Sequence, residues 1–186
     1  LCISWLGLPD VSYPSDVYEH QGILSLVKEL SIKDGKLYQT PVKGIEKLRQ
    51  SSLPFNKYIK NTSNCYELNL KLKGDMIHEL ILFSDKDGNG LSLIFNLVDG
   101  EVVVDRSNVG EALATEYSSV RTAPIDPVDT TARIFIDNSV FEIFINDGEM
   151  IFSGRVFPHE DQNGIFIKSG NPTGTYYELE YGRKTN

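Results

Sequence analysis

The chain has 186 residues, enough for one domain with a sizeable core and an additional segment. Its hydrophobic content of 40% and charged content of 24% are typical of a globular protein, and no apolar run approaches the roughly 20 residues of a membrane span. A net charge of −8 and a pI of about 4.9 argue against general affinity for nucleic acid or for an anionic membrane. The two cysteines, Cys2 and Cys65, give no disulfide framework, so we expect a reducing, cytoplasmic location.

The first predicted element is a short apolar stretch, residues 1–8, which contains the single tryptophan. It is typical of a buried strand that pairs with a segment further upstream, because the chain does not begin with Met and is expected to be part of a longer one. Residues 22–26 alternate like a strand, and residues 31–40 contain a hairpin turn at Asp34-Gly35.

The pattern changes at Pro41, after which apolar residues follow a spacing of three to four. Because proline suits the first turn of a helix, residues 41–52 predict a short helical linker and a domain boundary. From residue 53 the chain is nearly all strand, with roughly ten to twelve short strands separated by turns. The alternation in residues 66–72 is typical of a strand with one wet face. Residues 53–186 therefore predict an all-β fold, an antiparallel β-sandwich of two sheets.

The strongest local signal lies in residues 133–158. Asp147-Gly148 predicts a two-residue type I′ hairpin, which needs positive φ at both central positions. Three apolar residues share one face of the strand before this turn: Phe141, Ile143 and Ile145. Val140 and Phe144 make the other face partly apolar, so this block of three antiparallel strands is predicted to lie inside a sheet and not at its edge.

No metal or cofactor site is expected. Residues 85–90 (DKDGNG) match the first half of a calcium loop, but Asn96 stands where the bidentate Glu belongs and strands flank the loop, so a surface hairpin is favoured. Three histidines lack ligand spacing: His20, His78 and His159. No P-loop, G-x-S-x-G or G-x-G-x-x-G motif occurs.

The last strand carries two candidate constellations. Glu178 and Glu180 lie about 6.6 Å apart along a strand, within the range of about 5–9.5 Å that glycosidase carboxylates use, although an exposed strand face explains them more simply. The sequence gives a weak prediction of a sugar-stacking platform from three tyrosines: Tyr176, Tyr177 and Tyr181. Tyrosines on strands are more often half-buried packing residues, and both interpretations stay open.

Several stretches together resemble one family. They are residues 5–10 (WLGLPD), 13–16 (YPSD), 22–30 (GILSLVKEL), 33–42 (KDGKLYQTPV), 141–149 (FEIFINDGE) and 157–158 (FP). In this order they resemble the C-terminal part of glycoside hydrolase family 32, the sucrose-6-phosphate hydrolases and invertases. Val27-Lys28 and Ile23 depart from the family's Pro-Arg and Cys.

The resemblance implies a parent enzyme with an N-terminal five-bladed β-propeller and a C-terminal β-sandwich. Residues 1–40 would then close the last propeller blade, residues 41–52 would be the linker, and residues 53–186 the sandwich. The family hydrolyses β-fructofuranosides with retention, using an Asp nucleophile and a Glu acid and base. Its N-D-P-N-G, R-D-P and E-C-P motifs do not occur here. The chain alone is therefore expected to carry no catalytic residue and to be inactive.

The resemblance also implies the partners: the propeller of the same protein, a second copy in a homodimer, and sucrose or sucrose 6-phosphate bound by the parent. We expect the sandwich to stabilise the propeller or to support dimerisation. Four apolar residues are expected to be exposed without the rest of the propeller: Leu1, Ile3, Trp5 and Leu8. The alternatives are a stand-alone carbohydrate-binding module that uses the tyrosines and a glycanase that uses Glu178 and Glu180.

Overall fold

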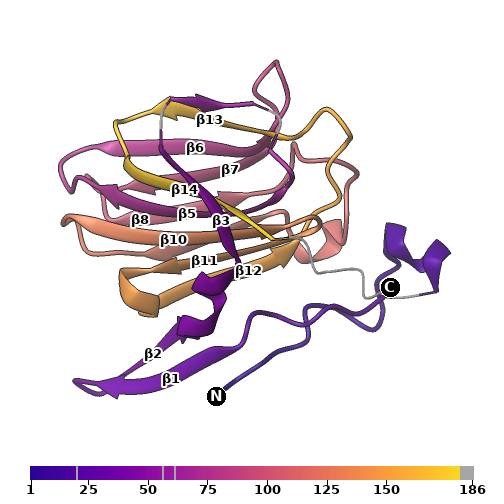
Figure 1. Cartoon of the computed structure of the whole chain (residues 1–186), viewed down its shortest axis with the longest axis horizontal. Coiled ribbons are helices and arrows are strands. Elements are labelled where there is room, and N and C mark those ends of the chain that lie inside the picture. Colours follow the sequence, from indigo (N-terminus) through magenta and orange to yellow (C-terminus); the bar gives the residue numbers. More distant parts are fainter. Residues whose placement is uncertain (20, 56, 61, 181–186) are drawn as a thin grey trace.

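The computed structural model describes residues 1–19, 21–55, 57–60 and 62–180, which form a nearly all-β fold (Figure 1). The strands are β1 (Lys28–Lys33), β2 (Lys36–Pro41), β3 (Arg49–Pro54), β4 (Tyr58–Ile59), β5 (Cys65–Leu72), β6 (Ile77–Ser84), β7 (Leu91–Asn96), β8 (Glu101–Asp105), β9 (Val120–Pro124), β10 (Thr130–Asp137), β11 (Val140–Ile145), β12 (Met150–Arg155), β13 (Gly164–Ser169) and β14 (Thr173–Leu179). Four short 3-10 helices connect them: η1 (Pro14–Tyr18), η2 (Lys43–Leu48), η3 (Thr115–Tyr117) and η4 (Asn146–Gly148).

Twelve of these strands form two antiparallel six-stranded sheets. The first sheet has the order β12-β11-β10-β5-β14-β3, and the second has the order β4-β13-β6-β7-β8-β9. Both sheets contribute apolar side chains to one shared core, among them Leu68, Ile134 and Ile143 from the first and Leu82, Leu93 and Phe95 from the second. Burial of this apolar surface is the main driving force for folding. The two packed antiparallel sheets confirm the predicted β-sandwich.

The three consecutive strands predicted in residues 133–158 are present as β10, β11 and β12, paired antiparallel. Their predicted position inside the sheet is wrong for β12, which is an edge strand. Phe141 faces the shared core, whereas Phe144 belongs to a second apolar cluster on the opposite face. That face is apolar because residues from the N-terminal part of the chain, Leu26 and Ile45, cover it. The apolar character of both faces therefore does not require another strand beside β12.

The predicted two-residue type I′ turn at Asp147-Gly148 is also wrong. Ile145 pairs with Met150, so the loop between β11 and β12 contains four residues. Asn146, Asp147 and Gly148 all have positive φ, at 48°, 56° and 82°. By contrast, Asp34-Gly35 does form the predicted two-residue hairpin between β1 and β2, since Lys33 pairs with Lys36.

Residues 1–8 do not form the predicted buried strand. They run antiparallel to residues 23–28, held by isolated bridges from Cys2 to Lys28 and from Trp5 to Leu24. The predicted strand over 22–26 is reduced to one of these bridges. The expected exposure of apolar side chains is confirmed, because Leu1 is 87% exposed and Trp5 is 48% exposed, with Ile3 and Leu8 also exposed.

The helix predicted over residues 41–52 is present only as η2, and the residues after it form strand β3. β3 is drawn into the first sheet by pairing with β14, where Leu53 lies opposite Tyr176. The sheet therefore begins at Arg49, ahead of residue 53. Figure 1 shows the β1–β2 hairpin as a separate arm beside edge strand β12.

Candidate functional site

The face of the first sheet that points away from the shared core is covered by the N-terminal part of the chain. We call this the outer face, and its side chains that contact the N-terminal part include Arg133, Phe135, Glu142, Phe144 and Arg155. Residues 1–48 are called the N-terminal segment. An apolar cluster joins the two, in which Leu26 and Ile45 of the segment pack against Phe135 and Phe144. Around this cluster, the outer face holds the segment through charged groups.

Glu142 is the most enclosed of these groups. It is 2% exposed and accepts a short hydrogen bond from the backbone N–H of Leu26. The Lys28 ammonium, itself on a residue only 4% exposed, lies 3.4 Å from Glu142 Oε2 and donates to Ser25 Oγ at 3.1 Å. Ser153 Oγ donates to the same carboxylate at 3.3 Å. A buried ion pair loses hydration on both sides and is tolerated only where such additional bonds are made, so this contact fixes the position of residues 25–28 on β11.

A second charged group surrounds Glu67, whose side chain is fully buried. Arg49 donates to it from Nε and Nη2, both at 2.8 Å, and Arg133 donates from Nε at 2.9 Å. Glu46, on η2, lies within ion-pair distance of both arginines. The hydrogen bonds to Glu67 raise the pKa of the Arg49 guanidinium, whose Cζ lies 4.0 Å from the centroid of the Tyr177 ring. This network joins η2 and β3 to the centre of the sheet.

Arg155 makes the third contact between the N-terminal segment and the outer face. Its guanidinium lies 4.8 Å from the ring centroids of both Tyr13 and Phe157. It donates from Nη1 to the carbonyl of Gln21 at 2.7 Å and from Nη2 to Ser139 Oγ at 3.2 Å. Tyr13 and Gln21 are thereby held at the end of β12.

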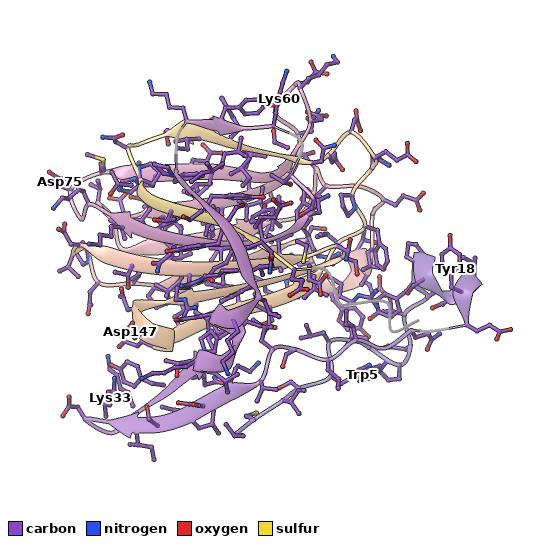
Figure 2. All side chains as sticks on the ribbon, in the orientation of Figure 1. Trp5, Tyr18, Lys33, Lys60, Asp75 and Asp147 are labelled. Carbon is purple, nitrogen blue, oxygen red and sulfur yellow. The ribbon has the colours of Figure 1, made fainter. Side chains whose placement is uncertain are left out.

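The loop between β11 and β12 contacts strand β2. A Cβ atom on Gly148 would lie 1.9 Å from the carbonyl oxygen of Gln39, so only glycine allows this approach. Glu149 in the same loop forms a short ion pair with Lys36. Figure 2 shows Asp147 on this loop, next to the β1–β2 arm. The stretch 142–149 therefore touches the N-terminal segment at two places, near Lys28 and along β2.

The three tyrosines predicted as a sugar platform are not brought together. Tyr176 is buried in the shared core, with its ring 5.3 Å from that of Tyr66, and burial raises its pKa to about 12. Tyr177 lies on the opposite face under Arg49. Tyr181 lies outside the described residues. Tyr176 and Tyr177 therefore cannot stack on a single sugar.

The carboxylate pair lies at the end of β14. Glu178 is exposed, and Glu180 accepts a hydrogen bond from Gln50 Nε2 at 3.4 Å while its backbone N–H donates to Leu48 at 2.7 Å. These contacts connect the strand end to β3 and η2. They indicate a structural position at the end of an inner strand of the sheet.

The residues considered as metal ligands have structural surroundings. Asp85 accepts hydrogen bonds at 2.9 Å from the backbone N–H groups of Asp87 and Asn89 within the predicted surface hairpin. Desolvation pushes the pKa of Asp85 up, but these hydrogen bonds and one from the Asn89 side chain lower it overall. His78 is buried with Nε2 3.0 Å from the Lys73 carbonyl, and His159 is exposed. His20 lies outside the described residues, and among those described no cluster of three His, Cys, Asp or Glu side chains could hold a metal ion.

Sequence reasoning missed Glu142 and Lys28 as site residues. A signal existed in the sequence VFEIFI, where a single carboxylate interrupts a strand whose two faces are otherwise apolar. Such a residue is almost never fully buried unless it is paired. Its partner, 114 positions away, is visible only in the fold.

Known proteins share this β-sandwich and its N-terminal segment. The family model described as "Glycosyl hydrolases family 32 C terminal" matches residues 33–181. A sucrose-6-phosphate hydrolase of Streptococcus mutans is 51% identical over 179 residues, covering 96% of this chain and 37% of that protein. One of Lactococcus lactis subsp. lactis is 42% identical over 175 residues, covering 91% and 34%. The structure of sucrose-6-phosphate hydrolase from Lactobacillus gasseri matches with a TM-score of 0.91 at 35% identity, over 96% of this chain and 38% of that one.

The sheets and their covered outer face define a β-sandwich module with an attached N-terminal segment. The chain belongs to glycosyl hydrolase family 32, in its C-terminal domain, which confirms the resemblance seen in the motifs. It spans 37% and 34% of the lengths of the two curated relatives described above. Among the described residues, no helix has the length and apolar character to cross a membrane.

Proposed function

We propose that this chain is the C-terminal module of a retaining β-fructofuranosidase that hydrolyses sucrose 6-phosphate or sucrose. The names of the relatives support this substrate class, and their greater length leaves room for a catalytic propeller. In this proposal residues 1–40 complete the propeller, residues 41–52 form the linker, and the rest is the sandwich. The protein works in the cytoplasm, in keeping with two free cysteines.

The module itself is non-catalytic and holds the end of the propeller in place. The observation that carries this role is the buried contact of Glu142 with Lys28 and the Leu26 N–H, which joins the sandwich to the segment assigned to the propeller. Because the ion pair is buried on both sides, it tolerates little displacement. The sandwich thereby fixes both the position and the direction of the last propeller segment.

The exposed face of the N-terminal segment supports the same role. Its large apolar side chains point into solvent in the described residues: Leu1, Ile3, Trp5, Leu24, Leu30 and Ile32. Several large exposed apolar side chains on one segment are typical of an interaction site. The proposed occupant is the chain that precedes this one in the parent protein.

The test uses the whole protein that contains this chain, compared with a version that ends at residue 41. We expect the shortened protein to lose solubility and to melt at a lower temperature, with loss of sucrose 6-phosphate hydrolysis. Equal melting temperature and solubility would contradict the stabilising role. Hydrolysis by the present chain alone, with no preceding residues, would contradict its non-catalytic assignment.

In the whole protein, Glu142→Leu should lower the melting temperature while leaving turnover of the folded fraction unchanged. The matched control is Glu160→Leu, which removes an exposed carboxylate and should have little effect. If both variants melt like the wild type, Glu142 does not couple the two parts.

A second copy of the chain is a further proposed partner. Edge strand β3 leaves one side of its backbone unpaired within the first sheet, and Leu53 on it is exposed. Such an edge can add a strand from another molecule. Analytical ultracentrifugation of the whole protein should show a dimer that Leu53→Lys weakens, and a monomer at every concentration would contradict it.

A further inference from the structure

A pocket of about 280 Å³ lies between the N-terminal segment and the β8–β9 connection, residues 106–119. Trp5 and Tyr13 line it from the segment, and Arg155 lines it from β12. Arg106 begins the connection and Arg121 follows it on β9, and both side chains belong to the wall of the pocket. The pocket is separate from the two groups of buried ion pairs on the outer face.

The pocket gathers the arginines that have no ion pair. Of the five arginines in the described residues, Arg49 and Arg133 form ion pairs on the outer face. The other three form none within the described ranges, and all of them line the pocket: Arg106, Arg121 and Arg155. Because a guanidinium group is always charged, three positive charges meet here without a paired carboxylate.

The carboxylates nearest to the pocket have other partners or stay in solvent. Asp10 accepts a short hydrogen bond from the hydroxyl of Tyr117. Asp16 accepts a hydrogen bond from the backbone N–H of Tyr13 at 3.0 Å. Glu116 is exposed on the connection, and in the described residues it forms no ion pair with an arginine. These groups therefore leave the guanidinium N–H groups without a carboxylate acceptor.

The electrostatic surroundings of the arginines agree with this shortage of negative charge. Desolvation, followed by the repulsion of Arg121, lowers the pKa of Arg106, although Glu116 acts in the opposite direction. Desolvation likewise lowers the pKa of Arg155, and the influence of Asp16 is too small to reverse the shift. In both cases the nearby carboxylates do not compensate for the loss of water around the cation.

Several guanidinium N–H groups are left for a further acceptor. Arg106 donates only from Nη2, at 3.1 Å to the carbonyl of Ala114 and at 3.4 Å to that of Ser118, so its Nε and Nη1 have no partner among the described residues. Arg155 is 8% exposed, and its buried Nε has no hydrogen-bond partner. Such groups are expected to be satisfied in the complete protein, because an unpaired buried donor is costly.

The position of the pocket indicates where the acceptor comes from. Its wall includes Trp5 and Leu8, which are 48% and 37% exposed, and Figure 2 shows Trp5 on the N-terminal segment. In the proposed function this segment is covered by the chain that precedes Leu1. A purely apolar cover would take water away from the arginines and leave their charges unpaired, and charged groups are buried only when they are paired. The covering chain must therefore bring a negative group to the pocket.

We infer that the chain preceding Leu1 in the parent protein places the carboxylate of an Asp or a Glu in this pocket, where it pairs with Arg106 and Arg121. The fork of N–H groups on arginine matches the two oxygens of a carboxylate. This inference rests on the proposed function, in which the preceding chain covers the segment. It adds a second charged docking point, at which the sandwich supplies the positive group, whereas at Glu142 it supplies the negative one. Two docking points of opposite charge favour one orientation of the partner over others.

The test is zero-length cross-linking of the whole protein carrying Arg106→Lys or Arg121→Lys. Both variants keep the positive charge, and a carbodiimide joins a lysine ammonium as an amide to a carboxylate that touches it. Mass spectrometry of the peptides should show position 106 or 121 linked to an Asp or a Glu that precedes Leu1. The exposed Lys73–Asp129 ion pair, at 2.7 Å, should be linked in every sample and serves as the positive control.

Three results would overturn the inference. The first is a link from position 106 or 121 only to Asp10, Asp16 or Glu116, which would place the counter-charge within this chain. The second is the absence of any link at these positions while Lys73 and Asp129 are joined. The third is a link between two copies, recognised by mixing isotope-labelled with unlabelled protein.

Charge reversal gives an independent test. Arg106→Glu should lower the melting temperature of the whole protein, and replacing the cross-linked carboxylate residue by Arg in the same variant should restore most of the loss. A structural role of Arg106 alone, through its bond to Ala114, could not be repaired from the preceding chain, so failure of this rescue would overturn the pairing. Lys86→Glu, an equal charge change on an exposed loop, should leave the melting temperature unchanged.

The outcome can be separated from that of the proposed function. If the whole protein shortened to residue 41 melts and dissolves like the intact one, the proposed stabilising role fails. If shortening destabilises the protein but the arginine positions are linked only within this chain, the inference about the pocket fails alone.

Discussion

The two faces of the first sheet have different roles, although adjacent residues of the same strand contribute to them. In β11, Ile143 points into the shared core, and Glu142 points to the outer face. The core face gains stability from apolar area that is removed from water, a driving force that has no preferred direction. The outer face uses buried charges, which contribute little net stability but are satisfied in one arrangement only. In this module, therefore, the core face provides most of the folding stability, and the outer face determines how the N-terminal segment is oriented.

The largest effect is expected on the core face. Ile143→Ala should lower the free energy of unfolding of the sandwich by about 4 kcal/mol, since it leaves a cavity at a fully buried position. Denaturant unfolding of the variant and the wild type measures this change. A loss below about 1 kcal/mol would mean that the two sheets can close the gap, contrary to a tightly packed core.

The outer face should respond more locally. Glu142→Leu should weaken docking of the N-terminal segment by about 3 kcal/mol, because Lys28 is left buried without its counter-charge. The double variant Lys28→Met/Glu142→Leu should recover most of that loss, since it buries no charge. Proteolysis of residues 9–28 under native conditions reports docking. Equal susceptibility of the single and double variants would show that the ion pair is not the source of the effect.

Substitutions at Gly148 and Gly35 distinguish the effect of backbone strain from the effect of contact with the N-terminal segment. Both have positive φ, at 82° and 77°, but only at Gly148 would a Cβ atom meet the carbonyl of Gln39. Gly148→Val should therefore destabilise the protein by more than about 1 kcal/mol, and by more than Gly35→Val, which adds strain alone. Thermal melting measures both. Similar losses in the two variants would mean that β2 does not rest on the loop.

The smallest effect is a dependence on alkaline pH. Burial raises the pKa of the Cys65 thiol from 9.0 to about 11, and that of Tyr176 from 10.0 to about 12. Between these values the unfolded chain has lost protons that the folded chain retains, so the contribution of these two groups to stability should be constant below about pH 9 and fall as the pH rises toward about 12. Melting midpoints across this range test the prediction, and Cys65→Ala should reduce the slope. A flat profile above pH 9 would contradict it.

Much of the fold follows from local patterns, and the site does not. Alternation in residues 141–145 and the Asp34-Gly35 turn depend on neighbouring residues, so the sequence is sufficient to predict them. The four-residue loop after Ile145 depends on its contact with β2, and β3 forms a strand because β14 offers a partner. The Glu142–Lys28 contact joins residues that no local pattern relates. What sequence alone leaves open is thus the set of long-range polar contacts.

The most direct test of the outer face as an orienting surface is native-state hydrogen exchange of the Ser25 and Lys28 amides. These N–H groups bond to Ser4 and Cys2, both at 2.8 Å, and so report order in the segment without touching position 142. In Glu142→Leu, their exchange should accelerate at least tenfold, while amides of β5 and β10 in the sheet centre stay protected as in the wild type. Equal acceleration of both groups, or of neither, would contradict the separation of stability from orientation.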